Sequence, residues 1–355
     1  MNIQELLSLT VKNNASDLHL LVGIPPSLRI DGALSSITTL PPVSNDDMES
    51  MIYSLLTPEQ KELLVANKEL DFSFGYGQGA YGDAGRFRIN VYYQRGYLSA
   101  AFRFLPPNVR TIDELHLPKI VHTFSKLKQG LVLVAGPTGH GKSTTLAAII
   151  NEINLTEQAH ILTIEDPIEY VYPPGKSIIS QREMGTDTHS WVMALRAALR
   201  EDPDTVLVGE MRDTDTMAAA ITIAETGHLV FSTLHTNSAS QSIDRIIDSF
   251  EASQQGQIRA QLAATLKGII SQRLLPLISG GRVPVTEILV GTLAVASNIR
   301  EGKTHLIDSV IQTSQDVGMV TLEASLAQLV VSGGITLDTA KAYTSHVDDL
   351  LRLIS

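Results

Sequence analysis

Cysteine is absent from this 355-residue chain. Its absence excludes disulfides, thiol catalysis and zinc sites built on thiolates, and it fits a protein of the reducing cytoplasm. An excess of positive charge is absent as well, because 27 Lys and Arg residues stand against 38 Asp and Glu residues, which leaves a net charge of -11. A protein that coats nucleic acid needs a basic surface for the phosphates, so we expect no nucleic acid among the partners.

Long hydrophobic runs are also missing. The apolar run at residues 131–135 is far shorter than the roughly 20 residues that cross a bilayer. Residues 1–7 contain no basic segment followed by an apolar stretch, so no secretory signal is read there. We therefore predict a cytoplasmic protein whose membrane association, if it has one, goes through a partner.

The length of the chain exceeds what one hydrophobic core usually serves, so two domains are expected. We predict a small α+β domain over residues 1–106 and an α/β domain over residues 119–355. Prolines and polar residues interrupt the pattern between them, which predicts an interdomain linker at residues 107–118.

Two strands of the first domain carry arginines. Residues 86–93 alternate polar and apolar side chains at the period of a half-buried strand, and residues 98–104 are predicted to be its hairpin partner. Arg88 and Arg103 are expected to share one face of this hairpin. They are either functional cations or ordinary arginines of a strand surface.

The second domain alternates short apolar runs with helical stretches. The runs lie at 131–135, 160–164, 205–208 and 229–233. This alternation is typical of a parallel sheet covered by helices. Beyond about residue 255 we expect amphipathic helices to dominate.

A phosphate-binding loop follows the first of these runs and precedes a helical stretch, which is the context that the G-x-x-x-x-G-K-[ST] pattern requires. Its glycines let backbone N–H groups point at phosphates, and the helix N-terminus adds positive potential. Lys142 is expected to reach the β- and γ-phosphates of ATP, and Ser143 to hold Mg²⁺. We interpret the His140 side chain as solvated. The predicted nucleotide-binding residues are Gly136, Pro137, Thr138, Gly139, His140, Gly141, Lys142, Ser143 and Thr144.

Acidic residues end two of the other predicted strands. Glu165 follows the run at 160–164, and Glu210 follows the run at 205–208. Ligands of open α/β sheets bind at the carboxyl ends of the strands, where carboxylates can hold Mg²⁺ or orient a water. We predict catalytic roles for both glutamates, with Glu210 also a metal ligand. Which of the two is the general base stays open.

Two histidines flank the last apolar run. His235 stands close to Thr233 and Asn237, and the pattern favours a γ-phosphate sensor or a group that orients the acidic residues. Zinc binding is not expected, because no third ligand lies nearby. For His228 a structural role is as well supported as a functional one.

These four elements, in this order, resemble the Walker A, Asp, Walker B and His boxes of the type II/type IV secretion ATPase superfamily. Within that superfamily the chain is similar to the pilus retraction (twitching motility) ATPases. The resemblance covers nearly the whole chain. It is carried also by segments at residues 15–20, 29–32, 85–90 and 181–185.

The resemblance implies an ATP-hydrolysing, Mg²⁺-dependent motor that retracts type IV pili. It implies a PAS-like first domain, a RecA-like second domain and a hexameric ring bound peripherally to the inner membrane through a platform protein. A second retraction ATPase is a possible partner. In such a ring Arg88 and Arg103 would complete the nucleotide site of the neighbouring subunit.

One segment departs from the retraction motors. They carry the element Ala-Ile-Arg-Asn-Leu-Ile-Arg-Glu, of which residues 294–301 keep the second arginine, Arg300, but not the first. That element belongs to retraction rather than to ATP turnover. The alternative interpretation is therefore an accessory paralogue of the motor, or a nucleotide-gated regulator with little turnover.

Overall fold

The structure, a computed structural model, describes residues 1–30, 32–77, 85–105 and 108–354. The chain divides into two compact units, residues 1–108 with 167–171, and residues 109–166 with 172 onward. The first holds an antiparallel sheet with helices and the second a mostly parallel sheet with helices. The predicted fold class is therefore confirmed.

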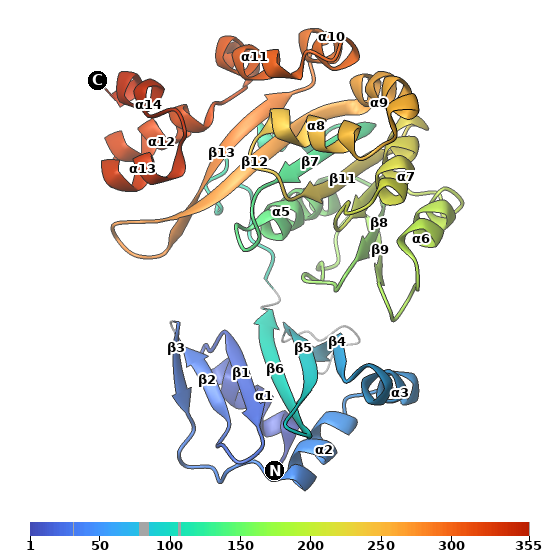
Figure 1. The fold of residues 1–355 in the computed structure, drawn as a ribbon, viewed down its shortest axis with the longest axis vertical. Coiled ribbons are helices and arrows are strands. Elements are labelled where there is room, and N and C mark those ends of the chain that lie inside the picture. The colour runs from blue at the N-terminus through green and yellow to red at the C-terminus, as the bar shows by residue number, and fades with distance from the viewer. Residues whose placement is uncertain (31, 78–84, 106–107, 355) are drawn as a thin grey trace. The chain divides into compact units, whose positions relative to one another are not determined.

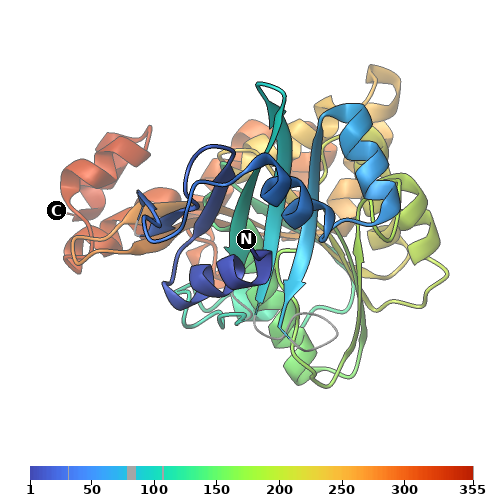
Figure 2. The same ribbon diagram turned by 90° about the horizontal axis from the view of Figure 1, so that it is seen from below.

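The first unit contains a six-stranded antiparallel sheet in the order β3-β2-β1-β6-β5-β4 (Figure 1). Figure 2 shows the helices α1 and α2 lying against its strands. The elements are α1 (Ile3–Lys12), β1 (Asp17–Leu21), β2 (Ser27–Ile30), β3 (Ala33–Ser36), α2 (Asn45–Tyr53), α3 (Pro58–Asn67), β4 (Glu69–Tyr76), β5 (Gly85–Gln94) and β6 (Tyr97–Leu105).

Burial along β5 follows the predicted alternation, since Phe87, Ile89 and Val91 are buried and the residues between them are partly exposed. The buried side chains join those of α1 and α2 in one hydrophobic core. Strands β5 and β6 pair antiparallel, with Arg88 directly opposite Arg103. The predicted hairpin and the shared face of the two arginines are thus confirmed, because directly opposed residues of an antiparallel pair point the same way.

The second unit contains a seven-stranded sheet in the order β13-β12-β7-β11-β10-β8-β9. All of its neighbouring strands pair parallel except β12 with β13. Its strands are β7 (Gly130–Ala135), β8 (His160–Glu165), β9 (Ile178–Glu183), β10 (Thr205–Val208), β11 (Leu229–Leu234), β12 (Leu266–Pro276) and β13 (Arg282–Val290). The four predicted parallel strands are all present.

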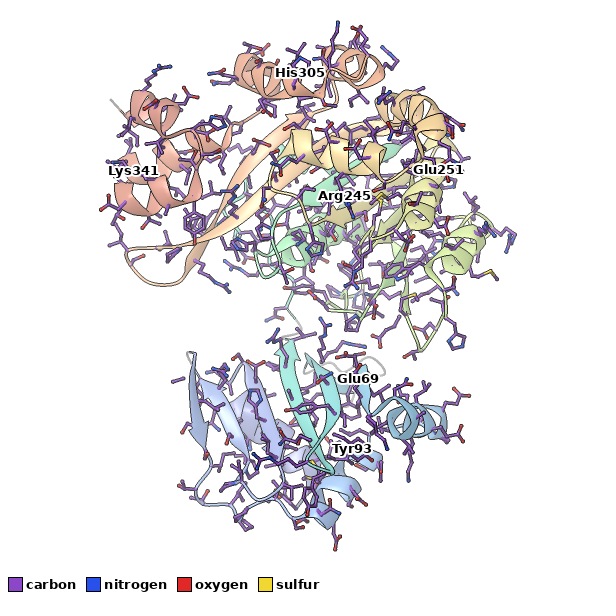
Figure 3. All side chains as sticks on the ribbon, viewed as in Figure 1. Glu69, Tyr93, Arg245, Glu251, His305 and Lys341 are labelled. Carbon is purple, nitrogen blue, oxygen red and sulfur yellow. The ribbon has the colours of Figure 1, made fainter. Side chains whose placement is uncertain are left out.

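Helices cover this sheet and present polar side chains to solvent, among them Arg245 on α8, His305 on η1 and Lys341 on α13 (Figure 3). Among the described residues, none of the helices is long and apolar enough to cross a membrane. The helices are α4 (Val121–Phe124), α5 (Lys142–Thr156), α6 (Trp191–Ala198), α7 (Thr214–Glu225), α8 (Ala239–Asp248), α9 (Ala252–Thr265), α10 (Leu293–Arg300), η1 (Thr304–Leu306), α11 (Ile307–Thr313), η2 (Gln315–Val317), α12 (Leu322–Val331), α13 (Leu337–Tyr343) and α14 (Val347–Ile354).

The prediction that helices dominate beyond residue 255 is wrong between residues 266 and 290. This segment is the β12–β13 hairpin, and β12 extends the parallel sheet beside β7. Both Ile269 and Ile270 are fully buried, so the strand lacks the alternation that distinguishes a half-buried strand from a buried helix. The sequence does mark the turn of this hairpin with the glycine pair Gly280 and Gly281. Both adopt the left-handed backbone that glycine favours.

The segment predicted as a linker is mostly part of the second unit. Residue 107 lies outside the described residues, and the second unit begins at residue 109. Ile112, Leu115 and Leu117 are buried, and Thr111 and Glu114 exchange side chain to backbone hydrogen bonds around a tight turn. Apolar side chains between prolines therefore anchor this segment.

Candidate nucleotide site

The phosphate loop connects the buried strand β7 to helix α5. Gly136 allows a close approach to β12, since a Cβ atom there would lie 2.3 Å from the carbonyl oxygen of Gln272. The Lys142 side chain is buried, and its Nζ donates to the carbonyl oxygens of Gly136 at 2.8 Å and Pro137 at 3.1 Å. The loop thus holds its cation in the place where phosphates are bound in this motif.

The other predicted residues of the loop lie at the start of α5. Ser143 and Thr144 occupy its first turn, behind Gly141, which caps the helix with a left-handed backbone. Gly141 and Thr144 also line a cavity of about 300 Å³, together with residues of β12, β13 and the segment after residue 109. This cavity is next to the phosphate loop and within the second unit.

His140 is not the solvated side chain that the sequence suggests. Its Nδ1 accepts a hydrogen bond from the backbone N–H of Leu274 at 2.9 Å, and its carbonyl oxygen accepts one from Gln272 Nε2 at 2.8 Å. Burial lowers the pKa of His140 below its ordinary value, and the charges of Arg273, Lys142 and Arg282 lower it further. The sequence does not reveal these hydrogen bonds, because both partners, Gln272 and Leu274, lie more than 130 residues away in the chain.

Glu210 and His235 lie together at the carboxyl edge of the sheet. Glu210 Oε2 lies 3.6 Å from His235 Nε2, and His235 Nδ1 lies 3.3 Å from the Thr138 hydroxyl of the phosphate loop. The Glu210 side chain is 15% exposed and that of His235 is 47% exposed. A continuous chain of polar contacts therefore runs from the loop through the histidine to the glutamate.

Arg212 is a member of this site that the sequence reasoning did not identify. Its Nη2 lies 2.7 Å from Glu210 Oε1, and its side chain is largely exposed. Its only sequence signal is its position two residues after the strand-end glutamate. Each carboxylate oxygen of Glu210 thus faces a nitrogen of a different side chain.

Glu165 lies one strand farther from the loop than Glu210, because β8 follows β10 in the sheet. A Cβ atom on Gly209 would lie 3.3 Å from the Glu165 Cα, so the two acidic strand ends are adjacent. Glu165 Oε1 accepts hydrogen bonds from Thr163 Oγ1 at 2.7 Å and Gln181 Nε2 at 3.4 Å. These donors fix the Glu165 carboxylate at the same edge.

His228 lies at the other end of β11. Its Nδ1 lies within hydrogen-bonding distance of Thr226 Oγ1 and of the Ile223 carbonyl oxygen. This histidine therefore has local structural partners and is distant along the strand from the carboxyl edge. Of the two histidines considered, the site contains His235.

The N-terminal arginines differ in their partners. Arg103 Nε donates to Asp17 Oδ1 at 3.0 Å, although the arginine side chain is 66% exposed. Among the described residues, no carboxylate forms an ion pair with Arg88. A structural role is thus visible for Arg103, and Arg88 is the better candidate for contact with a ligand.

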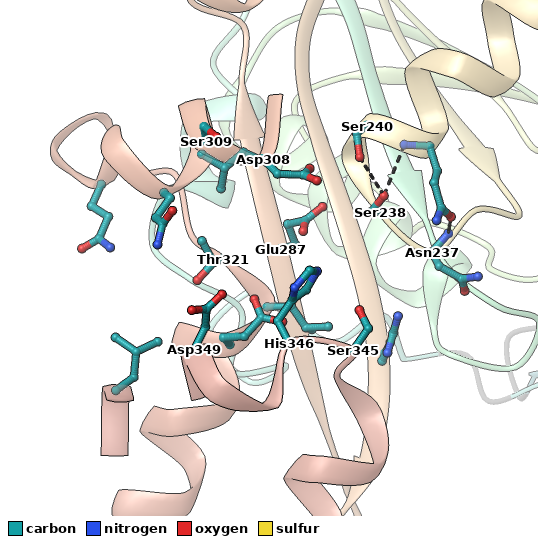
Figure 4. A pocket seen from close by; sticks show the side chains of 18 of the residues that line it. Asn237, Ser238, Ser240, Glu287, Asp308, Ser309, Thr321, Ser345, His346 and Asp349 are labelled. Atoms are coloured by element: carbon teal, nitrogen blue, oxygen red, sulfur yellow. Dashed lines mark hydrogen bonds between the residues drawn. The ribbon is translucent and has the colours of Figure 1, made fainter. Parts of the chain in front are cut away.

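A second cavity, of about 530 Å³, lies beside the segment that follows His235 (Figure 4). Glu287 faces it and accepts a hydrogen bond from the Ala239 N–H, the first residue of α8, at 2.7 Å. Burial raises the pKa of Glu287 to about 7, and the carboxylates of Asp308 and Glu323 add to the effect. The cavity is larger than the one at Thr144 but has an acidic lining and no phosphate loop, so it is a poor site for ATP.

The chain belongs to the family of type II/IV secretion system proteins, whose model matches residues 111–334. It is 46% identical over 341 residues to the type IV pilus retraction ATPase PilT of Pseudomonas aeruginosa, covering 96% of this chain and 97% of that protein. The type IV pilus ATPase PilU of the same organism is 38% identical over 355 residues, covering 100% of this chain and 91% of that protein. The crystal structure of the pilus retraction motor PilT with bound ADP matches with a TM-score of 0.91 at 46% identity, covering 99% of each chain. The predicted family is thus confirmed.

Glu210→Gln is expected to lower the kcat of ATP hydrolysis by ~10²-fold or more while nucleotide binding changes little, because the two roles predicted for this residue, orienting water and holding Mg²⁺, both need the charge of the carboxylate. Glu165→Gln is expected to act in the same direction. Steady-state kinetics and binding of a fluorescent ATP analogue check both. The matched control is Glu225→Gln, at the exposed end of α7, where the carboxylate accepts a hydrogen bond from Gln261. Wild-type kcat in either variant would remove that glutamate from the site.

Proposed function

We propose that this chain is an ATP-hydrolysing motor that retracts type IV pili by removing pilin subunits. The observation that carries the proposal is the match to the ADP-bound retraction motor, which extends over 99% of both chains. The greater identity to PilT than to PilU, 46% against 38%, favours the principal motor over the accessory paralogue. The accessory paralogue retains one supporting feature, because residues 294–301, which form most of α10 and its C-cap, match the retraction element only in part.

In this proposal the backbone N–H groups of the phosphate loop and Lys142 bind the phosphates of ATP. Ser143 and Glu210 supply oxygen ligands suited to Mg²⁺, which prefers few protein ligands in addition to phosphates and water. When bound, Mg²⁺ neutralises charge on the phosphates. The base and ribose lie in the 300 Å³ cavity, where Leu274 and Pro284 offer apolar surface and Arg282 a cation.

Glu210 or Glu165 positions the attacking water in line with the γ-phosphate. The contact of His235 with both Thr138 and Glu210 supports its role as a γ-phosphate sensor, since a ligand against Thr138 would move the histidine and with it the glutamate. If His235 acts as this sensor, the kcat of ATP hydrolysis should fall less in His235→Ala than in Glu210→Gln.

The working assembly in this proposal is a homohexamer in the cytoplasm, docked on the platform protein of the pilus machine at the inner membrane. A second retraction ATPase is a further partner. Each cycle of hydrolysis in the ring changes the contacts to the platform protein and withdraws pilin.

The test of the function is deletion of the gene in the bacterium that carries it. Surface twitching is expected to disappear while pili remain on the cells, because assembly does not depend on the retraction motor. Electron microscopy and a motility assay on agar check both observations. Complementation with the wild-type chain should restore twitching, and complementation with Lys142→Ala should not. Loss of pili in the deletion strain, or full motility in it, would contradict a retraction function.

A further inference from the structure

We infer that His140 is a positioning residue that attaches the phosphate loop to strand β12 while its imidazole is neutral, and that its protonation sets an acid limit on nucleotide capture. The attachment is a property of the chain itself. The consequence for capture rests on the proposed ATPase function.

The loop and β12 are joined by a set of hydrogen bonds centred on His140. Its backbone carbonyl accepts from Gln272 Nε2 at 2.8 Å, and its ring accepts from the Leu274 N–H at 2.9 Å. The Gln272 side chain also accepts from Thr145 Oγ1 of α5 at 2.6 Å. Residues 272 and 274 therefore hold both the loop and the first turn of the helix.

The fit between loop and strand leaves little room for displacement. A Cβ atom at Gly136 would lie 2.3 Å from the Gln272 carbonyl oxygen, and one at Gly141 would lie 3.0 Å from Gln272 Nε2. His140 directly precedes Gly141, and its ring contacts Leu274 of the same strand.

The bond to Leu274 requires one protonation state. A backbone N–H can only donate, so Nδ1 must keep its lone pair, and the neutral ring then carries its proton on Nε2. Protonation of Nδ1 would place two donors against each other and leave the Leu274 N–H without its acceptor. The bond from Leu274 to the ring therefore exists only while the ring is neutral.

The charged groups that act on the ring all favour the neutral form. They are Lys142 from α5, Arg273 from β12 and Arg282 from β13, and burial acts in the same direction with the largest effect. The attachment is fully present above pH 6.5, the ordinary pKa of histidine, and is lost as the pH falls through the lowered pKa of the folded chain. Acid thus breaks the bond between the His140 ring and Leu274, while the bond from Gln272 to the His140 carbonyl remains.

The loss expected is that of one buried hydrogen bond, about three- to tenfold in nucleotide capture. Because kcat/KM reports groups of the free enzyme, its pH profile should decline on the acid side by this factor.

Nitrogen-15 NMR of the full chain labelled at histidine tests the attachment without any activity. One signal set, assigned by its loss in His140→Asn, should show protonated Nε2 and unprotonated Nδ1 at pH 7.5 and a pKa below 6.5. A protonated Nδ1 at that pH, or an ordinary pKa, would overturn the inference.

Kinetics test the consequence, with kcat/KM for MgATP measured from pH 5.5 to 8.5. His140→Ala should lose about three- to tenfold at pH 7.5. His140→Asn keeps an acceptor near the place of Nδ1, so it should recover part of that loss and lack the acid decline. His305→Asn, on the exposed helix η1, should match the wild type at every pH. An unchanged acid decline in His140→Asn would overturn the inference. A wild type without turnover at any pH would instead overturn the proposed function, and the NMR result would still decide the attachment.

Discussion

The Lys142→Ala protein is expected to hydrolyse MgATP at least ~10³-fold more slowly than the wild type, because the ammonium neutralises charge that develops on the transferred phosphoryl group. The buried position of the side chain strengthens the effect, since charge interactions are stronger away from water. A coupled assay of ADP release, with nucleotide affinity measured separately, checks this.

The matched control is Lys128→Ala. Lys128 is largely exposed and forms an ion pair with Glu157. It precedes β7 in the chain, whereas the phosphate loop follows that strand. Its loss should leave the kcat within about twofold of the wild type, because exposed ion pairs contribute little. Turnover above one tenth of the wild-type value in Lys142→Ala would contradict the role assigned to the lysine.

Local patterns were sufficient to predict the parallel strands and the edge of the sheet at which the candidate site residues lie. The runs at 131–135, 160–164, 205–208 and 229–233 are buried parallel strands, and each predicted site residue of the second unit follows one of them. This worked because parallel strands end at one edge, so residues that follow different strands come together whatever their separation in sequence.

Contacts between distant segments could not be predicted in this way. The β12–β13 hairpin has no alternation because both faces of β12 are buried. The Leu274 N–H that bonds His140 belongs to that hairpin, so an error in the secondary structure concealed the partner of the loop. Likewise, no local pattern indicates that Asp17 lies beside Arg103, because β1 and β6 pair although these two residues are 86 positions apart in the chain.

The relation of Arg103 to Asp17 changes how the arginine hypothesis is tested. Arg103 is bonded to a carboxylate, so replacing it disturbs the first unit as well as any ligand contact. Arg88 lies directly opposite on β5 and is the variant with the clearer outcome. Arg88→Ala alone should lower kcat by ~10³-fold if the guanidinium stabilises the transition state from a neighbouring subunit.

Mixing two inactive proteins tests whether the active site is shared. In a ring with head-to-tail interfaces, each site would combine the phosphate loop of one subunit with the arginine of the next. When Lys142→Ala and Arg88→Ala subunits assemble together, some sites pair an intact loop with an intact arginine, so ATP hydrolysis should reappear. The control mixture is Lys142→Ala with Glu210→Gln. Both changes then affect the same half of the site, every mixed site keeps one defect, and activity should stay at the level of the parent proteins. If the Lys142→Ala and Arg88→Ala mixture is as inactive as this control while mass spectrometry shows mixed rings, Arg88 acts within its own subunit or only supports the fold.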